Sequence, residues 1–382
     1  MPDGTWRIKA ASLRDIMKGS EKQINKSQLF CMIIIVGLTS AVLALPQVLA
    51  AEAGRDLWVS MLLGFAVCFL PLVLIVQIYK LNPDAGLYEI IKNSLGHIGA
   101  KIIYALFFLY FGWKTLMLFG ETKSFCLNRL YDTLPWYFYA LIFGGFAAFM
   151  AARGLKASAR LGELSLFFLL AALVICVCTA AGGLDPKRLL PVMENGFASV
   201  FKGFYKTAVW FGDFLVLFMM LGKIKPDGKL PRALYAGWGA TAFLAVAFAA
   251  VYRSLYGGLS EIQGRGAAFA SIADFSGGGG RGPVSGLLNQ IWLLACFVKL
   301  AVLFWAANEA LMKICGCQKP LYTALPLAAA LYVLSVFAID KIGGGVYIAV
   351  RYGNYLAAAV YTIAPVIILI CAVIYKRGRL KA

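Results

Sequence analysis

Three charged residues interrupt long apolar stretches of this sequence. Lys114, Asp213 and Lys299 are each flanked on both sides mainly by aromatic and aliphatic residues. A charge at the centre of a bilayer costs about 3 kcal/mol on insertion scales, so each side chain is expected to face protein and to have a partner. Asp213 can pair with either lysine or with the ammonium group of a ligand. A purely structural ion pair, or a lysine that reaches the membrane surface, is the alternative.

Lys114 belongs to a polar stripe on one predicted helix. Tyr110, Lys114, Met117 and Glu121 are spaced by four, three and four residues, which places them on one helix face. The stripe predicts that this face points toward the interior of a helical bundle. At least one of the central charges is then expected to line a cavity.

Two short segments are candidates for ligand binding because they weaken a membrane helix at its middle. The first, Gly37–Ser40, reads Gly-Leu-Thr-Ser, and the second, Trp210–Asp213, reads Trp-Phe-Gly-Asp. A helix that restarts after a break points its N–H groups and its positive dipole end at an anion such as a carboxylate. Close helix packing is the alternative, since small residues also allow two helices to approach. The candidate ligand-binding residues are therefore Gly37, Leu38, Thr39, Ser40, Trp210, Phe211, Gly212 and Asp213.

The composition is that of a polytopic membrane protein. Of the 382 residues, 61% are hydrophobic and 14% are charged, and the mean hydropathy is +0.79. A soluble domain carries about 25% charged residues. The net charge of +18 is concentrated in short loops and tails, where basic residues face anionic membrane lipid, so no nucleic-acid partner is expected.

The apolar runs predict an all-α fold of ten transmembrane helices. The expected spans lie near residues 28–50, 57–79, 102–122, 134–152, 164–182, 206–222, 232–253, 285–309, 321–338 and 354–375. Placing both termini in the cytoplasm collects 22 of the 36 lysines and arginines on that side. The positive-inside rule therefore favours this orientation.

The order of the spans predicts a five-plus-five inverted repeat. An odd number of spans in the first half inverts the second half, and the first and sixth spans, which carry the two weak segments, become equivalent. The expected divisions are a cytoplasmic tail (1–27), a first repeat (28–182), an extracytoplasmic loop (183–205), a second repeat (206–375) and a cytoplasmic tail (376–382).

The sequence offers little support for catalysis or for a cofactor. The single histidine, His97, lies in a predicted loop, and no serine–histidine–acid or metal-ligand cluster is visible. Cys315 and Cys317 have no third ligand nearby, so no metal is expected. The glycine run Gly277–Gly280 lacks the lysine and the strand–helix context of a phosphate-binding loop. We expect neither an enzyme nor a cofactor.

Several motifs follow one another in a recognisable order. Lys22–Ser60 contains a Gln-Leu-Phe opening, the small residues at Gly37–Ser40, a Leu-Pro pair and the run Ala53–Trp58, which reads Ala-Gly-Arg-Asp-Leu-Trp. Ala159–Phe168 contains an Arg-x-x-Glu pattern. This order resembles the B-subunit family of spore germinant receptors, which is similar to permeases of the amino acid–polyamine–organocation superfamily. Asp213 departs from the glutamate usual in that family, which keeps the charge but shortens its reach.

The resemblance implies a fold and a role. It implies the five-plus-five repeat with broken spans one and six, and a chain that senses a small amino acid or similar nutrient in the inner membrane of the endospore. A-type and C-type receptor subunits are the implied partners. By position, Gly37–Ser40 would hold a ligand carboxylate and Trp210–Asp213 would shape the opposite wall. Lys299 would lie between spans one and eight, where sodium-coupled relatives bind their ion. A proton-coupled secondary amino-acid transporter and a scaffold subunit are the alternatives.

Overall fold

A computed structural model describes most of the chain as helix. The described residues are 23–83, 85–129, 134–194, 196–225, 228, 230–259, 268–274, 282–341 and 345–381. Most of the predicted N-terminal tail and the glycine run Gly277–Gly280 lie outside them. Within these ranges the chain forms helices, and Ile24 and Ile224 make an isolated bridge.

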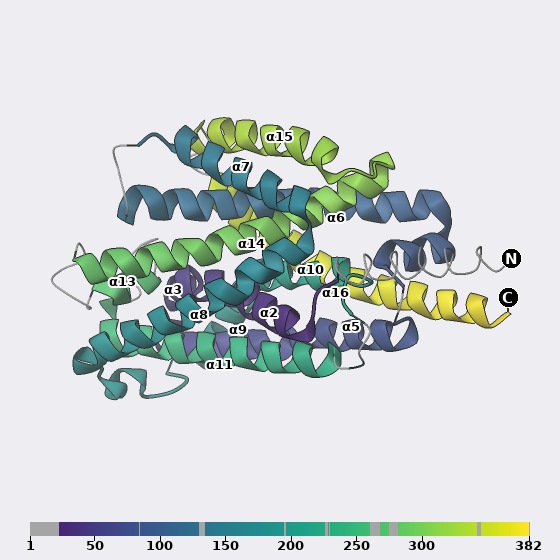
Figure 1. The fold of residues 1–382 in the computed structure, drawn as a ribbon. Helices are drawn as coiled ribbons and strands as arrows, with labels where there is room; N and C mark the ends of the chain where they lie inside the picture. Colours follow the sequence, from purple (N-terminus) through teal and green to yellow (C-terminus); the bar gives the residue numbers. More distant parts are fainter. Residues whose placement is uncertain are drawn as a thin grey trace, which may run out of the picture.

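The helices form one elongated bundle (Figure 1). In chain order they are α2 (Lys26–Leu43), α3 (Leu45–Ala53), η1 (Gly54–Asp56), α4 (Leu57–Val67), α5 (Phe69–Leu81), α6 (Leu87–Arg129), α7 (Trp136–Arg153), α8 (Leu155–Ala180), η2 (Ala181–Gly183), η3 (Pro186–Leu189), α9 (Gly196–Phe211), η4 (Gly212–Leu215), α10 (Val216–Met219), α11 (Leu230–Tyr256), α13 (Ala268–Ala273), α14 (Pro283–Cys315), α15 (Pro320–Lys341) and α16 (Gly345–Lys381). Helix α14 runs through the bundle and packs against α6, α7 and α8. Helix α11 packs on α2, and α9 packs on α3 and α4.

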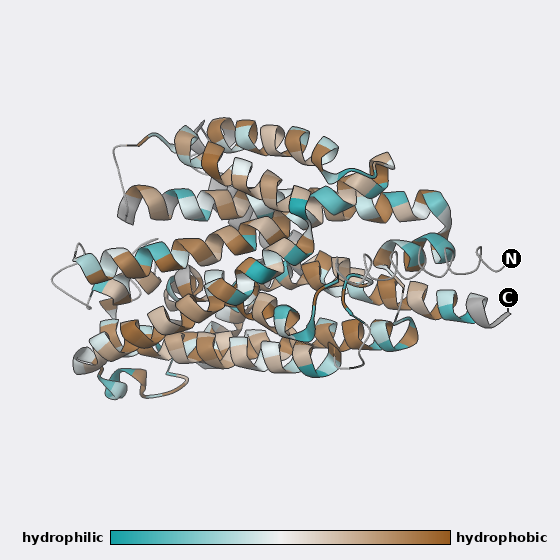
Figure 2. Cartoon of the chain, in the orientation of Figure 1, coloured by the Kyte–Doolittle hydropathy of each residue, from teal (hydrophilic) through white to brown (hydrophobic). Residues whose placement is uncertain are grey.

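The outer surface of the bundle is apolar, as lipid requires. Leu106, Phe167 and Phe243 are more than 60% exposed although they lie within long helices. Figure 2 shows hydrophobic residues along the outward faces of the helices. Because water would penalise so much exposed apolar surface, the chain is a multi-pass membrane protein.

Eight stretches among the described residues are long and apolar enough to cross a membrane. One of them, Leu45–Leu81, combines the end of the first predicted span with the whole of the second. The remainder of the first span is the shorter apolar helix Lys26–Val42. The sixth predicted span consists of α9, η4 and α10, none of which has the length of a full crossing.

The first span is interrupted, but not where the residue types predict. Gly37–Ser40 is continuous α-helix within α2, and the helix ends at Leu43. Helix α3 begins at Leu45 with Pro46 in its first turn. Because proline has no N–H and its ring clashes with the carbonyl four residues earlier, the bend falls at Ala44. The predicted break at Gly37–Ser40 is therefore wrong in position by about one turn of helix.

The sixth span changes its helical type at the expected glycine. Helix α9 ends at Phe211, and the chain continues as the 3₁₀ segment η4 from Gly212 to Leu215. A Cβ atom on Gly212 would lie 2.0 Å from the Tyr110 hydroxyl oxygen, so only glycine allows α6 to approach this closely. Helix α9 starts at Gly196, ahead of the predicted span start at 206.

The first described residues and the last helix meet at one end of the bundle. The Ile24 N–H donates to the Lys223 carbonyl at 2.9 Å, and the neighbouring Gly222 lies against Gly86 between α5 and α6. In the same connection, Asn82 Nδ2 donates to a backbone carbonyl of α16 at 3.0 Å. This arrangement is the one expected if the chain crosses the membrane an even number of times. The side of the membrane to which this end belongs stays a prediction.

The Ala-Gly-Arg-Asp run fastens a connecting loop between α8 and α9. Asp56 is fully buried, and its Oδ1 atom accepts a hydrogen bond of 2.8 Å from the Met193 N–H. Arg55 Nη1 donates to the Leu190 carbonyl at 2.9 Å and lies 3.0 Å from Glu194 Oε2. The motif thus holds the loop against the start of α4.

Candidate functional site

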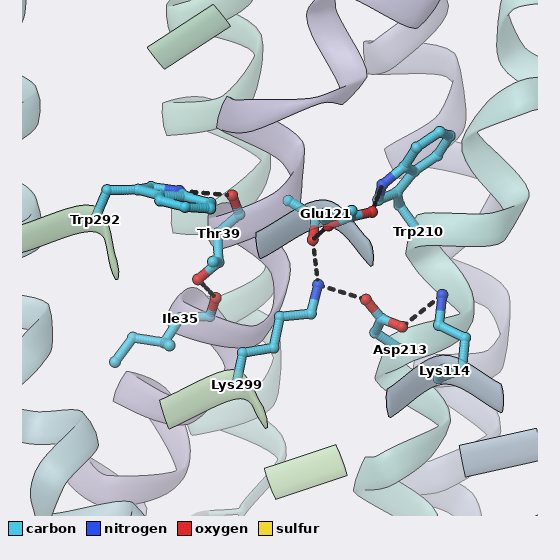
Figure 3. Close-up of polar contacts among 9 residues, drawn as sticks. Ile35, Thr39, Lys114, Glu121, Trp210, Asp213, Trp292 and Lys299 are labelled. Atoms are coloured by element: carbon cyan, nitrogen blue, oxygen red, sulfur yellow. Dashed lines mark hydrogen bonds and ion pairs between the residues drawn. The ribbon is translucent and has the colours of Figure 1, made fainter. Parts of the chain in front are cut away.

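The three charged residues that interrupt the apolar stretches meet inside the bundle (Figure 3). Lys114 Nζ on α6 lies 2.7 Å from Asp213 Oδ1, and Lys299 Nζ on α14 lies 2.5 Å from Asp213 Oδ2. The three side chains are 4%, 2% and 2% exposed. Asp213 therefore pairs with both lysines at once, and neither lysine reaches the membrane surface.

A second carboxylate extends this network toward α2 and α9. Lys299 Nζ also donates to Ser40 Oγ at 2.6 Å, and Ser40 Oγ donates to Glu121 Oε2 at 3.2 Å. The other oxygen of Glu121 accepts a 3.1 Å hydrogen bond from Trp210 Nε1. The polar chain therefore runs from Lys114 through Asp213, Lys299 and Ser40 to Glu121.

The formal charges in this network cancel. We call the network the central cluster, and it consists of Ser40, Lys114, Glu121, Trp210, Asp213 and Lys299. A buried charge that loses its partner costs several kcal/mol, so two ammonium groups require two carboxylates at this depth. The members come from α2, α6, α9, η4 and α14, and movement of any of these segments changes the cluster.

The space enclosed by the central cluster is small. Met117, Leu118 and Leu303 complete its walls, and its volume is about 10 Å³. A single water molecule needs roughly 10–15 Å³ on this measure. The site is thus closed in this structure, and any ligand larger than a water molecule would require α2, η4 or α14 to move apart.

Three of the predicted residues on α2 serve packing and helix geometry instead of lining this space. A Cβ atom on Gly37 would lie 2.4 Å from Phe214 Cζ and 2.6 Å from Thr241 Cγ2. Leu38 is fully buried. The Thr39 hydroxyl donates to the Ile35 carbonyl, four residues earlier, at 2.5 Å. The packing alternative therefore holds for Gly37, and Ser40 alone of this segment joins the cluster.

The second predicted segment, Trp210–Asp213, likewise contains residues that line the cluster and residues that pack elsewhere. Trp210 and Asp213 line the cluster, whereas Phe211 packs edge-on against Phe65 with ring centroids 4.5 Å apart. Gly212 faces Tyr110. The change to 3₁₀ helix at Gly212 rotates the following residue relative to a continuous α-helix. Asp213 consequently points at the two lysines.

Glu121 is a member of the cluster that sequence reasoning did not include among the site residues. It lies two helical turns after Lys114 on the same stripe of α6, which was the available signal. Glu121 belongs to the cluster through its hydrogen bonds with Ser40 and Trp210, which are 81 and 89 residues away along the chain. Spacing within one helix could not reveal those partners.

These features define the class of protein: an all-helical, multi-pass membrane protein with a charged polar cluster buried between interrupted helices. Residues 23–261 match the model of the Spore_permease family, whose description is spore germination protein. The chain belongs to this family.

Two curated relatives from Bacillus subtilis (strain 168) are similar to the chain. Spore germination protein KB is 30% identical over 203 residues, which cover 52% of this chain and 53% of the relative. Spore germination protein YndE is 23% identical over 374 residues, or 93% of this chain and 98% of the relative. The chain thus matches about half the length of the first relative and nearly all of the second.

Proposed function

We propose that this chain is the nutrient-sensing subunit of a spore germinant receptor and that its nutrient is a small amino acid. Family membership supports the role in germination. The central cluster supports the ligand, because it offers both signs of charge within hydrogen-bonding distance of one another. The observation that carries the proposal is that Lys299 joins α2 and η4 through Ser40 and Asp213. A ligand that disturbs this contact moves both interrupted spans.

Helix packing supports a five-plus-five repeat of ten spans. We pair α2–α3 with α9–α10, α4–α5 with α11, α6 with α14, α7 with α15, and α8 with α16. If each helix is replaced by its counterpart, the contact of α2 with α11 becomes a contact of α9 with α4, and the structure contains both. The contact of α8 with α14 likewise becomes that of α16 with α6, and the contact of α2 with α8 becomes that of α9 with α16. Such correspondence is expected of two inverted halves.

The ligand-binding surface comprises Ser40, Trp210 and Asp213 with the intramembrane charges Lys114 and Lys299. Gly37–Thr39, Phe211 and Gly212 support this surface from behind. The site performs binding and no catalytic chemistry. Binding favours an open arrangement of the first and sixth spans, and this population shift is passed to other subunits.

The subunit resides in the inner membrane of the endospore with both termini in the cytoplasm. A-type and C-type receptor subunits are its protein partners, and anionic lipid faces its basic loops. The resemblance in motif order supports the membrane and the two protein partners, and the distribution of lysine and arginine supports the orientation. The names of the two relatives support the role in spore germination.

A proton-coupled amino-acid transporter is the second candidate function. The observation that favours it is the chain of titratable groups, Lys114, Asp213, Lys299 and Glu121, connected directly or through Ser40. Uptake of labelled amino acid into proteoliposomes, driven by a pH gradient, distinguishes the two. Binding without uptake supports the sensor, and concentrative uptake supports the transporter.

Ligand binding is expected to raise the thermal stability of the purified, detergent-solubilised protein. An amino acid present at 100 times its dissociation constant adds about 2.7 kcal/mol to the free energy of unfolding. Melting temperatures measured across the common L-amino acids, glucose and inosine provide the test. A shift with one or a few amino acids supports the proposal, and no shift with any of these compounds contradicts it.

The same shift is expected to be independent of sodium. The Lys299 ammonium group, 2.6 Å from Ser40 Oγ, already supplies a positive charge between α2 and α14. A second cation beside it would be repelled. Melting temperatures compared in sodium chloride and in choline chloride at equal ionic strength check this. A shift that appears only with sodium would show that the lysine does not take that role.

A further inference from the structure

The two carboxylates of the central cluster differ in whether positively charged groups lie next to them. Asp213 has an ammonium group within 2.7 Å of each of its oxygens. The two hydrogen bonds of Glu121 come instead from neutral donors, the Ser40 hydroxyl and the Trp210 indole. Within the described part of the chain, no lysine or arginine lies within ion-pair distance of Glu121. Glu121 is therefore the carboxylate that gains most from an added cation.

The cluster is consequently polarised. Lys114, Asp213 and Lys299 together carry one net positive charge, and Glu121 carries one negative charge. Ser40 Oγ lies between the two parts, 2.6 Å from Lys299 Nζ and 3.2 Å from Glu121 Oε2. A neutral hydroxyl thus separates a cation from an anion that do not touch.

We propose that Glu121 binds the ammonium group of the nutrient and that Lys299 binds its carboxylate, with the ligand taking the place of the Ser40 bridge. The ligand class is accordingly a zwitterion whose two charges are close together, as in an α-amino acid. This inference rests on the proposed function, and it assigns the ammonium group to Glu121 and not to Asp213. Trp210, which donates its indole N–H to Glu121, holds this carboxylate in place.

A ligand between Lys299 and Glu121 cannot fit into the closed form. The single Ser40 hydroxyl bridges Lys299 Nζ and Glu121 Oε2, so the two side chains are close together. The space beside them has a volume of about 10 Å³. Binding must therefore separate Lys299 from Ser40, which removes one of the hydrogen bonds that join α14 to α2 and leaves the one from Trp292 Nε1 to the Thr39 carbonyl at 3.2 Å. This links recognition of the two charges to movement of the first span.

Single-charge analogues distinguish this arrangement from simpler ones. The primary amide of an amino acid keeps its ammonium group but loses the partner for Lys299. The des-amino carboxylic acid pairs with Lys299 but leaves Glu121 facing an added anion. Each analogue retains the side chain, so the differences in affinity report the charges alone.

The experiment measures dissociation constants by titration calorimetry for wild-type protein, Glu121→Gln, Glu121→Asp and Glu89→Gln. Glu89 is an exposed glutamate in the first turn of α6 and serves as the control. The probes are the common L-amino acids, the primary amide and des-amino acid of each one that binds, and glucose and inosine. Size-exclusion profiles establish that each variant is folded, and Glu121→Asp retains the charge if Glu121→Gln does not fold.

We expect wild-type protein to bind the amino acid at least about 30-fold more tightly than either analogue. Glu121→Gln should weaken amino-acid binding about 30-fold and strengthen binding of the des-amino acid, which no longer faces a carboxylate, whereas Glu121→Asp should lose less amino-acid affinity. Glu89→Gln should change neither affinity. Equal amino-acid affinity in wild type and Glu121→Gln would overturn the assignment and leave nutrient sensing intact. Binding of glucose or inosine without any amino acid would overturn the assignment and the amino-acid part of the proposed function, and binding of no probe would overturn both proposals.

Discussion

Replacement of Asp213 with asparagine is expected to lower the free energy of unfolding by about 3–5 kcal/mol. Asp213 compensates two lysines that are 4% and 2% exposed, so its neutral isostere leaves a net positive charge inside the bundle. Thermal unfolding of the detergent-solubilised variant measures this loss. The size of the effect follows from the tertiary structure, because residue types alone allowed Asp213 to pair with a ligand instead.

A double-mutant cycle tests the physical reason for that loss. Asp213→Asn should cost less in a Lys299→Met background, where one ammonium group is already absent, with a coupling energy of about 1–3 kcal/mol. Asp185→Asn is the control, since Asp185 and Arg188 are 44% and 43% exposed and such pairs contribute less than about 1 kcal/mol. Equal costs of Asp213→Asn in both backgrounds would contradict a direct Asp213–Lys299 interaction.

Gly37→Leu is expected to abolish the response to nutrient while the protein stays in the membrane. A Cβ atom at Gly37 would lie 2.4 Å from Phe214 and 2.6 Å from Thr241, on η4 and α11 respectively. Leucine at this position must push α2 away from the sixth span, which disturbs Ser40 one turn later. Overpacking of this kind costs about 1–3 kcal/mol of stability, and the ligand-induced rise in melting temperature should disappear.

Gly239→Leu on α11 is the matched control for this substitution. Gly239 is exposed, and a Cβ atom there would meet nothing within 4 Å. The control variant should retain both stability and ligand response. An unchanged response in Gly37→Leu would mean that contact between α2 and η4 is dispensable for recognition. Gly37→Ala, which adds one carbon, should give an intermediate loss.

The two substitutions probe different parts of one arrangement. Asp213 fixes the charges of the central cluster, and Gly37 fixes the distance at which α2 approaches η4. The 2.6 Å hydrogen bond between Lys299 Nζ and Ser40 Oγ depends both on the charges of the cluster and on the approach of α2. Charge and packing therefore both hold the closed form, and the proposed ligand would have to overcome both to open it.

The sequence by itself determined the class of the protein and the positions of its buried charges. Apolar runs long enough to cross a bilayer identify membrane helices, because lipid offers no partner to polar backbone. The cost of an intramembrane charge marks Lys114, Asp213 and Lys299 as inward-facing residues with partners. The order of short motifs indicated the spore germination family, to which the chain belongs. These conclusions depend on local composition and spacing, which the linear sequence contains.

Tertiary structure alone decided which groups meet. Asp213 pairs with both lysines, and Ser40 joins Lys299 to Glu121, across separations of 81 to 259 residues along the chain. The structure also shows the first bend at Ala44, whereas the sequence predicts it at Gly37–Ser40. The cause is that hydroxyl and small residues only permit a break, whereas proline enforces one and Gly37 is required for contact with Phe214. Partners and close approaches depend on how helices pack, and packing is set by the whole bundle.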